Sequence, residues 1–150
     1  MSALAQRPAR PADLDWLFQV HSAAMKRYVD ATWGWDESWQ VRNFTDHFDP
    51  SAIDVIQWGD VDVGFARVSR RADAIALDAL EILPAFQSRG IGSAYICRLI
   101  AEGSRSDLPV TLQVLKVNTR ARLLYERLGF NCVDETATHH LMRIDRDHAL

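Results

Sequence analysis

A loop late in the chain carries glycines at a spacing that suits the binding of an anion. Gly90 and Gly92 lie between an apolar segment at 74–83, which predicts a strand, and a segment at 93–100, which predicts a helix. Such a loop aims several backbone N–H groups, and the positive end of the helix dipole, at one point. Glycine has no Cβ, so the backbone can approach a ligand closely. The loop therefore predicts a phosphate site.

Two common nucleotide motifs do not fit this loop. The dinucleotide fingerprint needs a third glycine three residues after Gly92, where Tyr95 stands. The nucleotide P-loop needs a Gly-Lys-Ser or Gly-Lys-Thr ending, which is absent. What remains is a Gln/Arg-x-x-Gly-x-Gly pattern after a strand that ends at Pro84. Taken alone, this pattern is also compatible with a tight turn from strand to helix.

A second segment favours the phosphate site. Residues 118–130 read Asn-x-x-Ala-x-x-Leu-Tyr-x-x-x-Gly-Phe and follow a strand-like segment at 110–115. Together, the two segments resemble the GNAT superfamily of acyl-CoA-dependent N-acyltransferases. The loop resembles the pyrophosphate-binding motif of that superfamily, and the second segment resembles its Leu-Tyr-x-x-x-Gly-Phe motif. The resemblance is sharp over residues 73–131 and diffuse, although compatible in order, over the rest of the chain.

The resemblance implies an α/β fold with a mixed central sheet, helices on both faces and a splay between two central parallel strands. It implies acetyl-CoA as a co-substrate, bound beyond the carboxyl ends of those strands. The pantetheine arm would pair with the strand edge, and an N–H there would hold the oxyanion. The expected CoA-binding residues are Ile82, Leu83, Gln87, Ser88, Arg89, Gly90, Ile91, Gly92, Ser93, Asn118 and Tyr125.

Tyr125 is the predicted general acid. Acyl transfer from a thioester expels a thiolate, which a phenol within hydrogen-bond reach can protonate. Tyrosines at this place in the family motif have that role, although a core aromatic on the helix stripe is a compatible reading. Asn118 opens the same helix as a predicted N-cap, and the resemblance also implies contact with pantetheine.

A general base is harder to assign. Asp78 and Glu81 interrupt a strand that should be buried on both faces, and their odd separation predicts that they point to opposite faces. Glu81 lies nearer the splay, where a buried carboxylate suits a base. A salt bridge, or a solvated position at a bulge, is the alternative. Some family members carry glutamate where Gln113 stands, and an amide cannot accept that proton.

Aromatic and acidic residues between the first two predicted helices are candidates for acceptor recognition. Such side chains attract cationic amines, whereas core packing is the competing interpretation. The predicted acceptor-binding residues are Tyr28, Trp33, Trp35 and Asp36, with Trp39 and Glu37 nearby.

The elements that must position these residues follow from periodicity and turn signals. A strand at 3–8, a helix from Pro11 and a second helix at 36–47 come first. Strands at 53–58 and 61–66 flank a two-residue turn that begins with Gly59. The strand, loop and helix of the first motif follow, and then a strand at 110–115, a helix at 118–128, and strands at 130–133 and 140–144.

Composition limits the class of protein. The 150 residues fit a single N-acetyltransferase domain over 1–150. A net charge of −3 argues against nucleic acid as the partner, and no apolar run has the length of a membrane span. Cys97 and Cys132 lack metal-ligand spacing, so no metal is expected. They also give no disulfide framework, so a reducing, cytoplasmic setting is expected. Cys97 is predicted to be buried, and His139 with His140 to be a surface pair.

The predicted function is N-acetyl transfer from acetyl-CoA to a primary amine by direct attack in a ternary complex. The acceptor is expected to be a small cationic amine. The alternatives are a protein N-terminus or lysine, and a CoA-binding sensor without catalysis. The sequence leaves a homodimer open.

Overall fold

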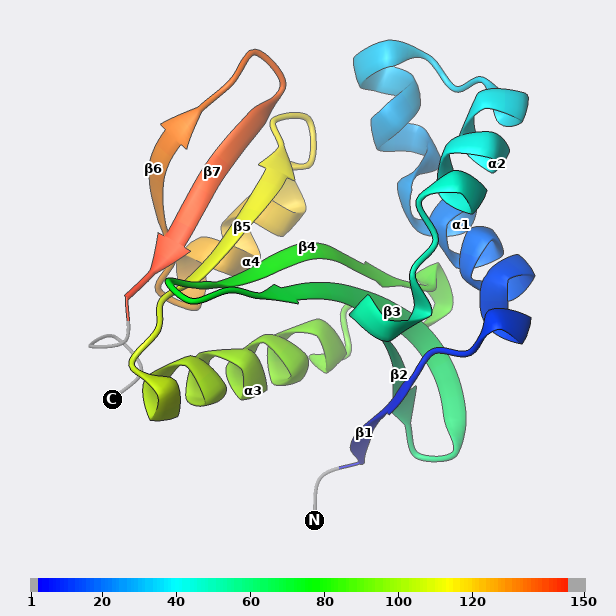
Figure 1. Cartoon of the computed structure of the whole chain (residues 1–150). Coiled ribbons are helices and arrows are strands. Elements are labelled where there is room, and N and C mark those ends of the chain that lie inside the picture. Colours follow the sequence, from blue (N-terminus) through cyan, green and yellow to red (C-terminus); the bar gives the residue numbers. More distant parts are fainter. Residues whose placement is uncertain (1–2, 146–150) are drawn as a thin grey trace.

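A seven-stranded mixed sheet, with helices on both faces, organises the chain (Figure 1). The computed structural model describes residues 3–145. The strands lie in the order β1-β2-β3-β4-β5-β7-β6. They are β1 (Leu4–Pro8), β2 (Ile53–Trp58), β3 (Val61–Arg70), β4 (Ile75–Ile82), β5 (Val110–Leu115), β6 (Asn131–Glu135) and β7 (His139–Ile144). The α-helices are α1 (Leu14–Trp33), α2 (Glu37–Asp46), α3 (Ile91–Ser106) and α4 (Thr119–Arg127).

The predicted fold class and the predicted order of elements are confirmed. Two strands have the predicted bounds, β2 and β5. The helix after the glycine loop is longer than predicted, because the turns that follow Ile100 are polar outside but still bury Gly103 against β5. The hairpin turn begins with Gly59 at φ +64°, as the glycine-first pattern predicts.

The parallel strands β4 and β5 separate after three residue pairs. Ile75–Leu77 pair with Val110–Leu112, and the strands diverge beyond these pairs. The β3–β4 register shifts where Arg67 faces Ala79 and Val68 faces Leu77, so Asp78 is the extra residue of a β-bulge. A bulge bends its strand, and Figure 1 shows β5, β7 and β6 turning away from β4. The splay is therefore encoded partly at Asp78.

The same bulge corrects the prediction that Asp78 and Glu81 point to opposite faces, which is wrong. Leu77 and Leu80 are three residues apart yet belong to the same apolar core, which shows that the alternation of side chains skips one residue between them. Asp78 and Glu81 consequently share the other face, where Ser69 donates a hydrogen bond to Asp78. The sequence pattern could not show the extra residue.

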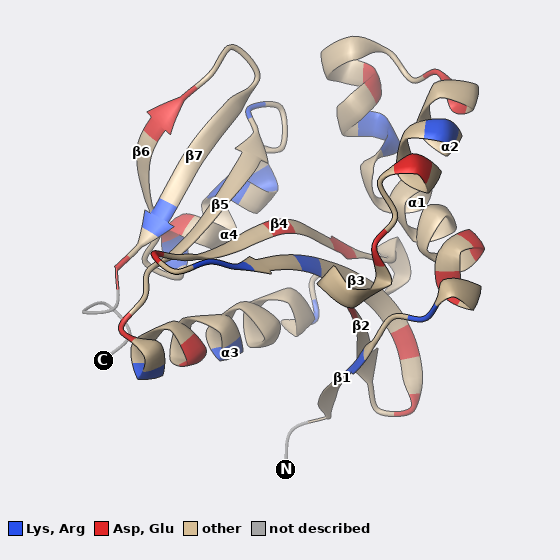
Figure 2. Ribbon diagram, viewed as in Figure 1, with Lys and Arg blue, Asp and Glu red and all other residues tan. Residues whose placement is uncertain are grey.

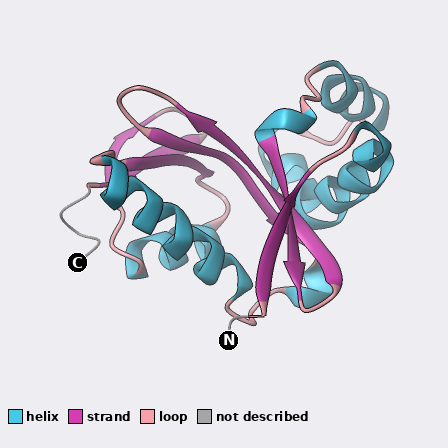
Figure 3. Ribbon diagram, turned by 60° about the horizontal axis from the view of Figure 1, so that its bottom comes forward, coloured by secondary structure: helices cyan, strands magenta, loops and turns pink. Residues whose placement is uncertain are grey.

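Two apolar cores hold the helices against the two faces of the sheet. Figure 3 shows these layers. The larger core packs α3 and α4 onto one face of the sheet, and includes Tyr95 and Tyr125. The smaller core packs α1 onto the other face, where Leu17 and Val20 contact Phe65. The first two helices therefore stand on the opposite side of the sheet from α3, the helix that follows the glycine loop.

Basic and acidic residues are intermixed along the described helices and strands (Figure 2). None of the helices within residues 3–145 is both long and apolar enough to cross a membrane. Within the same residues, no cluster of three or more His, Cys, Asp or Glu side chains could hold a metal ion. Cys97 is exposed on α3, so the prediction that it is buried is wrong.

Candidate active site

The glycine loop presents an open helix N-terminus. Gly90 has φ +78°, which glycine adopts without strain, and no side chain caps the first turn of α3. The first intrahelical bond in this turn runs from the Ala94 N–H to the Gly90 carbonyl. The N–H groups of residues 91–93 precede it and have no acceptor within the helix. These donors, at the positive end of the dipole, suit a pyrophosphate.

A cavity of about 420 Å³ lies over this turn and contains Gly90, Ile91, Gly92 and Ser93 in its wall. Ser88 and Gln87 also line this cavity. Arg89 does not line it, and its guanidinium instead lies 5.4 Å from the centroid of the Phe86 ring.

Arg120, in the first turn of α4, reaches back to the loop. It donates hydrogen bonds to the side chains of Gln87 and Ser88, and it lines the same cavity. Sequence reasoning missed this residue, although an arginine inside the second motif was a signal. It places a positive charge beside the open N–H groups, which would favour the negative charge of a phosphate.

The backbone N–H groups of Ile82 and Leu83, the two candidates to hold the oxyanion, point in different directions. The Leu83 N–H donates to the Val63 carbonyl at 2.9 Å, so it is directed to β3. Hydrogen bonding alternates along an antiparallel pair, so the Ile82 N–H is directed away from β3, into the splay. The Ile82 carbonyl accepts from the Gln87 side chain at 2.8 Å. Of the two, Ile82 alone has an N–H facing the gap.

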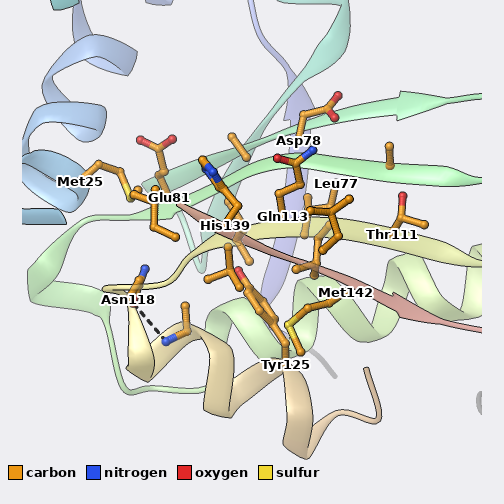
Figure 4. Close-up of a pocket in the computed structure, with 18 of the residues that line it drawn as sticks. Met25, Leu77, Asp78, Glu81, Thr111, Gln113, Asn118, Tyr125, His139 and Met142 are labelled. Atoms are coloured by element: carbon orange, nitrogen blue, oxygen red, sulfur yellow. Dashed lines mark hydrogen bonds between the residues drawn. The ribbon is translucent and has the colours of Figure 1, made fainter. Parts of the chain in front are cut away.

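Tyr125 stands where two cavities meet. It lines the 420 Å³ cavity at the glycine loop. It also lines a second cavity of about 670 Å³, whose wall includes residues of both β4 and β5 (Figure 4). The residues common to both walls are Met25, Leu80, Glu81, Asn118, Ala121 and Tyr125. Burial, with the nearby charge of Glu81, raises the pKa of Tyr125 to about 12, so the phenol keeps its proton at neutral pH. Asn118 caps α4 by accepting from the Ala121 N–H at 3.1 Å.

Glu81 belongs to a buried hydrogen-bonded chain. Its Oε1 lies 2.7 Å from Nδ1 of His21 on α1, and Nε2 of His21 lies 3.1 Å from Oε1 of Gln40 on α2. Glu81 and Gln40 are both buried. Burial opposes charge on the imidazole, but the hydrogen bond and charge of Glu81 outweigh it, so the pKa of His21 is raised. The contacts of Glu81 therefore agree with the salt bridge that is the alternative to a general base.

The larger cavity combines polar groups with an apolar rim. The cavity wall includes Asp78 and Glu81 from β4 and Gln113 from β5. His139, at the start of β7, also points into it (Figure 4). Trp33 and Val133 also line it, and both are 60% exposed, so the cavity reaches the surface between α1 and β6.

The predicted acceptor-binding residues do not form one group. Trp33 lines the larger cavity and Tyr28 the smaller one, whereas Trp35 and Asp36 line neither. The Trp35 ring packs 5.8 Å from the His21 ring, and Asp36 caps α2 by accepting from the Trp39 N–H at 3.0 Å. The carboxylate predicted to attract a cation is thus committed to a helix end.

A mixed sheet with a splayed parallel pair, and a glycine loop at the start of a helix, together define the class of fold. The family model described as Acetyltransferase (GNAT) family matches residues 17–130, and the chain belongs to this family.

Similar proteins add detail to this classification. The chain is 32% identical over 72 residues to [Ribosomal protein bS18]-alanine N-acetyltransferase of Haemophilus influenzae. That match covers 48% of this chain and 49% of the relative, about half the length of each.

Solved structures show the same fold. PaiA N-acetyltransferase of Thermoplasma acidophilum, in complex with coenzyme A, has a TM-score of 0.77 at 16% identity, covering 97% of this chain and 99% of that one. The ribosomal-protein-S18-alanine N-acetyltransferase of Escherichia coli has a TM-score of 0.70 at 19% identity, covering 95% and 93%.

Replacing Gly92 by Val is expected to weaken acetyl-CoA binding at least about tenfold, because the branched side chain would occupy the space where phosphates approach. A Cβ at this position meets only the Leu80 side chain, at 3.7 Å, so the variant should fold. The melting temperature with and without acetyl-CoA measures the effect, since a ligand of the native state raises it.

The matched control is Ala101→Val, an exposed position on the same helix outside this cavity. This variant also places a β-branched residue in α3, but acetyl-CoA should still raise its melting temperature as it does for wild type. A folded Gly92→Val protein that binds acetyl-CoA as tightly as wild type would refute the placement of the phosphates.

Proposed function

We propose that the protein is an acetyl-CoA-dependent N-acetyltransferase that joins both substrates in one ternary complex. The observation that carries this proposal is the pair of cavities that meet at Tyr125 and Glu81. Acetyl-CoA would occupy the smaller cavity, with its pyrophosphate on the first turn of α3. The Ile82 N–H, directed into the splay, suits the oxyanion of the tetrahedral intermediate.

The acceptor in this proposal is the N-terminal amino group of a polypeptide. Its cavity holds about 670 Å³ and opens past Trp33 and Val133, which suits a chain that continues into solvent. Glu81 and Asp78 place negative charge inside the cavity, where an ammonium group gains most from it. The relative that acts on an alanine of ribosomal protein bS18 supports the same acceptor class. A closed aromatic pocket for a small amine is expected to include Trp35 and Asp36, but neither residue lines either cavity.

A panel of acceptors tests the proposal through thiol release from acetyl-CoA. Its members are a short peptide with a free N-terminus, the same peptide with a blocked N-terminus and an internal lysine, and small mono- and diamines. The free peptide should have the highest kcat/KM. Preference for a diamine would transfer the acceptor to the small-amine class. Tight CoA binding without thiol release from any member would indicate a sensor.

Trp33→Ala is expected to raise KM for the peptide about fivefold and to leave KM for acetyl-CoA unchanged, because it removes binding shared by ground state and transition state. Trp39→Ala is the control. Trp39 is also half exposed, but it lines neither cavity. Equal KM values for the peptide in both variants would exclude Trp33 from acceptor binding.

A further inference from the structure

His139 occupies a position in the acceptor cavity that the sequence did not indicate. It begins β7 opposite Leu115, at the end of β5, and its ring enters the larger cavity near Glu81 and Gln113, above Tyr125 (Figure 4). His139 is half-buried there, so it belongs to the cavity wall as well as to the predicted strand pair. Its neighbour His140 does not line this cavity and lies 3.5 Å from Glu135 and 3.7 Å from Cys132 Sγ.

The contacts of His139 fix the ring and leave one nitrogen available. Nδ1 lies 2.8 Å from the Thr138 hydroxyl, and the ring packs 6.0 Å from the Trp33 ring. When Nδ1–H donates to the Thr138 oxygen, Nε2 carries the lone pair. Burial lowers the pKa of His139, so the ring is neutral at pH 7. A neutral imidazole with a free Nε2 can accept a proton.

Glu81 is less suited to accept that proton. Its Oε1 already accepts a hydrogen bond from His21, and its side chain is only 6% exposed. His139 is half-buried and touches both the cavity and its open rim. A group with access to both sides can take a proton from the acceptor and return it to solvent.

We propose that His139 is the general base that deprotonates the acceptor ammonium, an assignment that rests on the proposed acetyl transfer. An ammonium N–H bond breaks, and the proton moves to Nε2 of His139. The freed nitrogen lone pair attacks the thioester carbonyl carbon, the C–N bond forms, and the C–S bond breaks with its electron pair on sulfur. Tyr125 protonates that sulfur and regains a proton from the amide nitrogen, through water. His139 releases its proton to solvent.

The charged groups around His139 come from several elements. Asp78 and Glu81 on β4, and Arg71 after β3, line the same cavity, while burial is what lowers the pKa of His139. Tyr125 faces it from α4 as a neutral phenol. Lys116 and Glu135, beside the start of β7, pair with one another at 3.6 Å. The Trp33 ring covers it from α1.

The pH profile of kcat/KM with the free peptide tests the assignment. Wild type should rise with pH through an inflection below about 6.5, the ordinary pKa of histidine. His139→Gln should lose that inflection and fall more than about tenfold near pH 7, with recovery at high pH where the free amine forms unaided. His140→Gln should match wild type. NMR of the unliganded protein should show the His139 ring titrating below the same value.

The outcomes separate this assignment from the proposed function. Active His139→Gln protein with an unchanged pH profile, or a ring that titrates above about 6.5, overturns the assignment alone. Wild-type protein that acetylates no member of the acceptor panel overturns the acetyl transfer, and the assignment with it. Loss of the inflection in His139→Gln but not in His140→Gln supports both.

Discussion

Tyr125→Phe is expected to lower kcat about 10²-fold, within the range typical of acid–base groups. The phenol stands where the two cavities meet, and its pKa of about 12 keeps it protonated at neutral pH. Its hydroxyl makes no hydrogen bond to another side chain among residues 3–145, so it is free to donate to a departing thiolate. The ring remains in the variant, so KM for acetyl-CoA should change little.

Tyr95→Phe provides a matched control in the same core. The Tyr95 hydroxyl donates to Asp54 at 3.0 Å and lines neither of the two site cavities. Losing a hydrogen bond to a charged group should cost about 2 kcal/mol of stability and leave kcat intact. If instead Tyr125→Phe stays within twofold of wild type, under conditions where the chemical step limits the rate, the assigned acid is wrong.

The sequence predicted best where one local signal determines the structure. The glycine loop and the Asn118 cap are set by backbone conformations that few residue types satisfy, so the residue types and their local spacing predicted both. The order of strands and helices followed from apolar periodicity in the same way. The half of the site that we propose binds CoA is built almost wholly from these local features.

The half of the site that we propose binds the acceptor depends on contacts between distant segments. His21 contacts Glu81, which is 60 residues away in the sequence. His139, on β7, lines the larger cavity together with Glu81. Both histidines occur in segments whose periodicity predicts only a helix stripe or a strand. The bulge at Asp78 reversed the face of one carboxylate through a single extra residue. Pairwise geometry of this kind leaves no mark in a local pattern.

Glu81→Gln is expected to raise KM for the peptide acceptor about 30-fold, equivalent to about 2 kcal/mol, because a buried carboxylate facing an ammonium group loses its charge at constant shape. KM for acetyl-CoA should hold, since the proposed phosphate site is the first turn of α3. Two-substrate kinetics measure both constants on the same variant. A parallel change in both KM values would indicate a general disturbance of the splay.

The same substitution should change the pH dependence of stability. The pKa of His21 is raised in the folded protein above its ordinary 6.5, so the pair stabilises fully below that pH and loses this contribution as pH rises through the raised pKa. The wild type should exceed Glu81→Gln by about 2 kcal/mol near pH 6, and by about 1 kcal/mol once the imidazole is neutral. Urea unfolding at a series of pH values gives the difference.

Glu102→Gln isolates the titration of the histidine from the loss of a carboxylate. Its partner Arg70 lies 2.6 Å away and stays charged, while the hydrogen bond from Arg70 lowers the pKa of Glu102. At pH values above the ordinary pKa of glutamate, that pair therefore contributes a constant amount to the free energy of unfolding, about 0.5 kcal/mol for so exposed a pair. A difference for Glu81→Gln that also stays flat from about pH 5.5 to 8.5 would mean that His21 does not carry the charge that holds Glu81 in place.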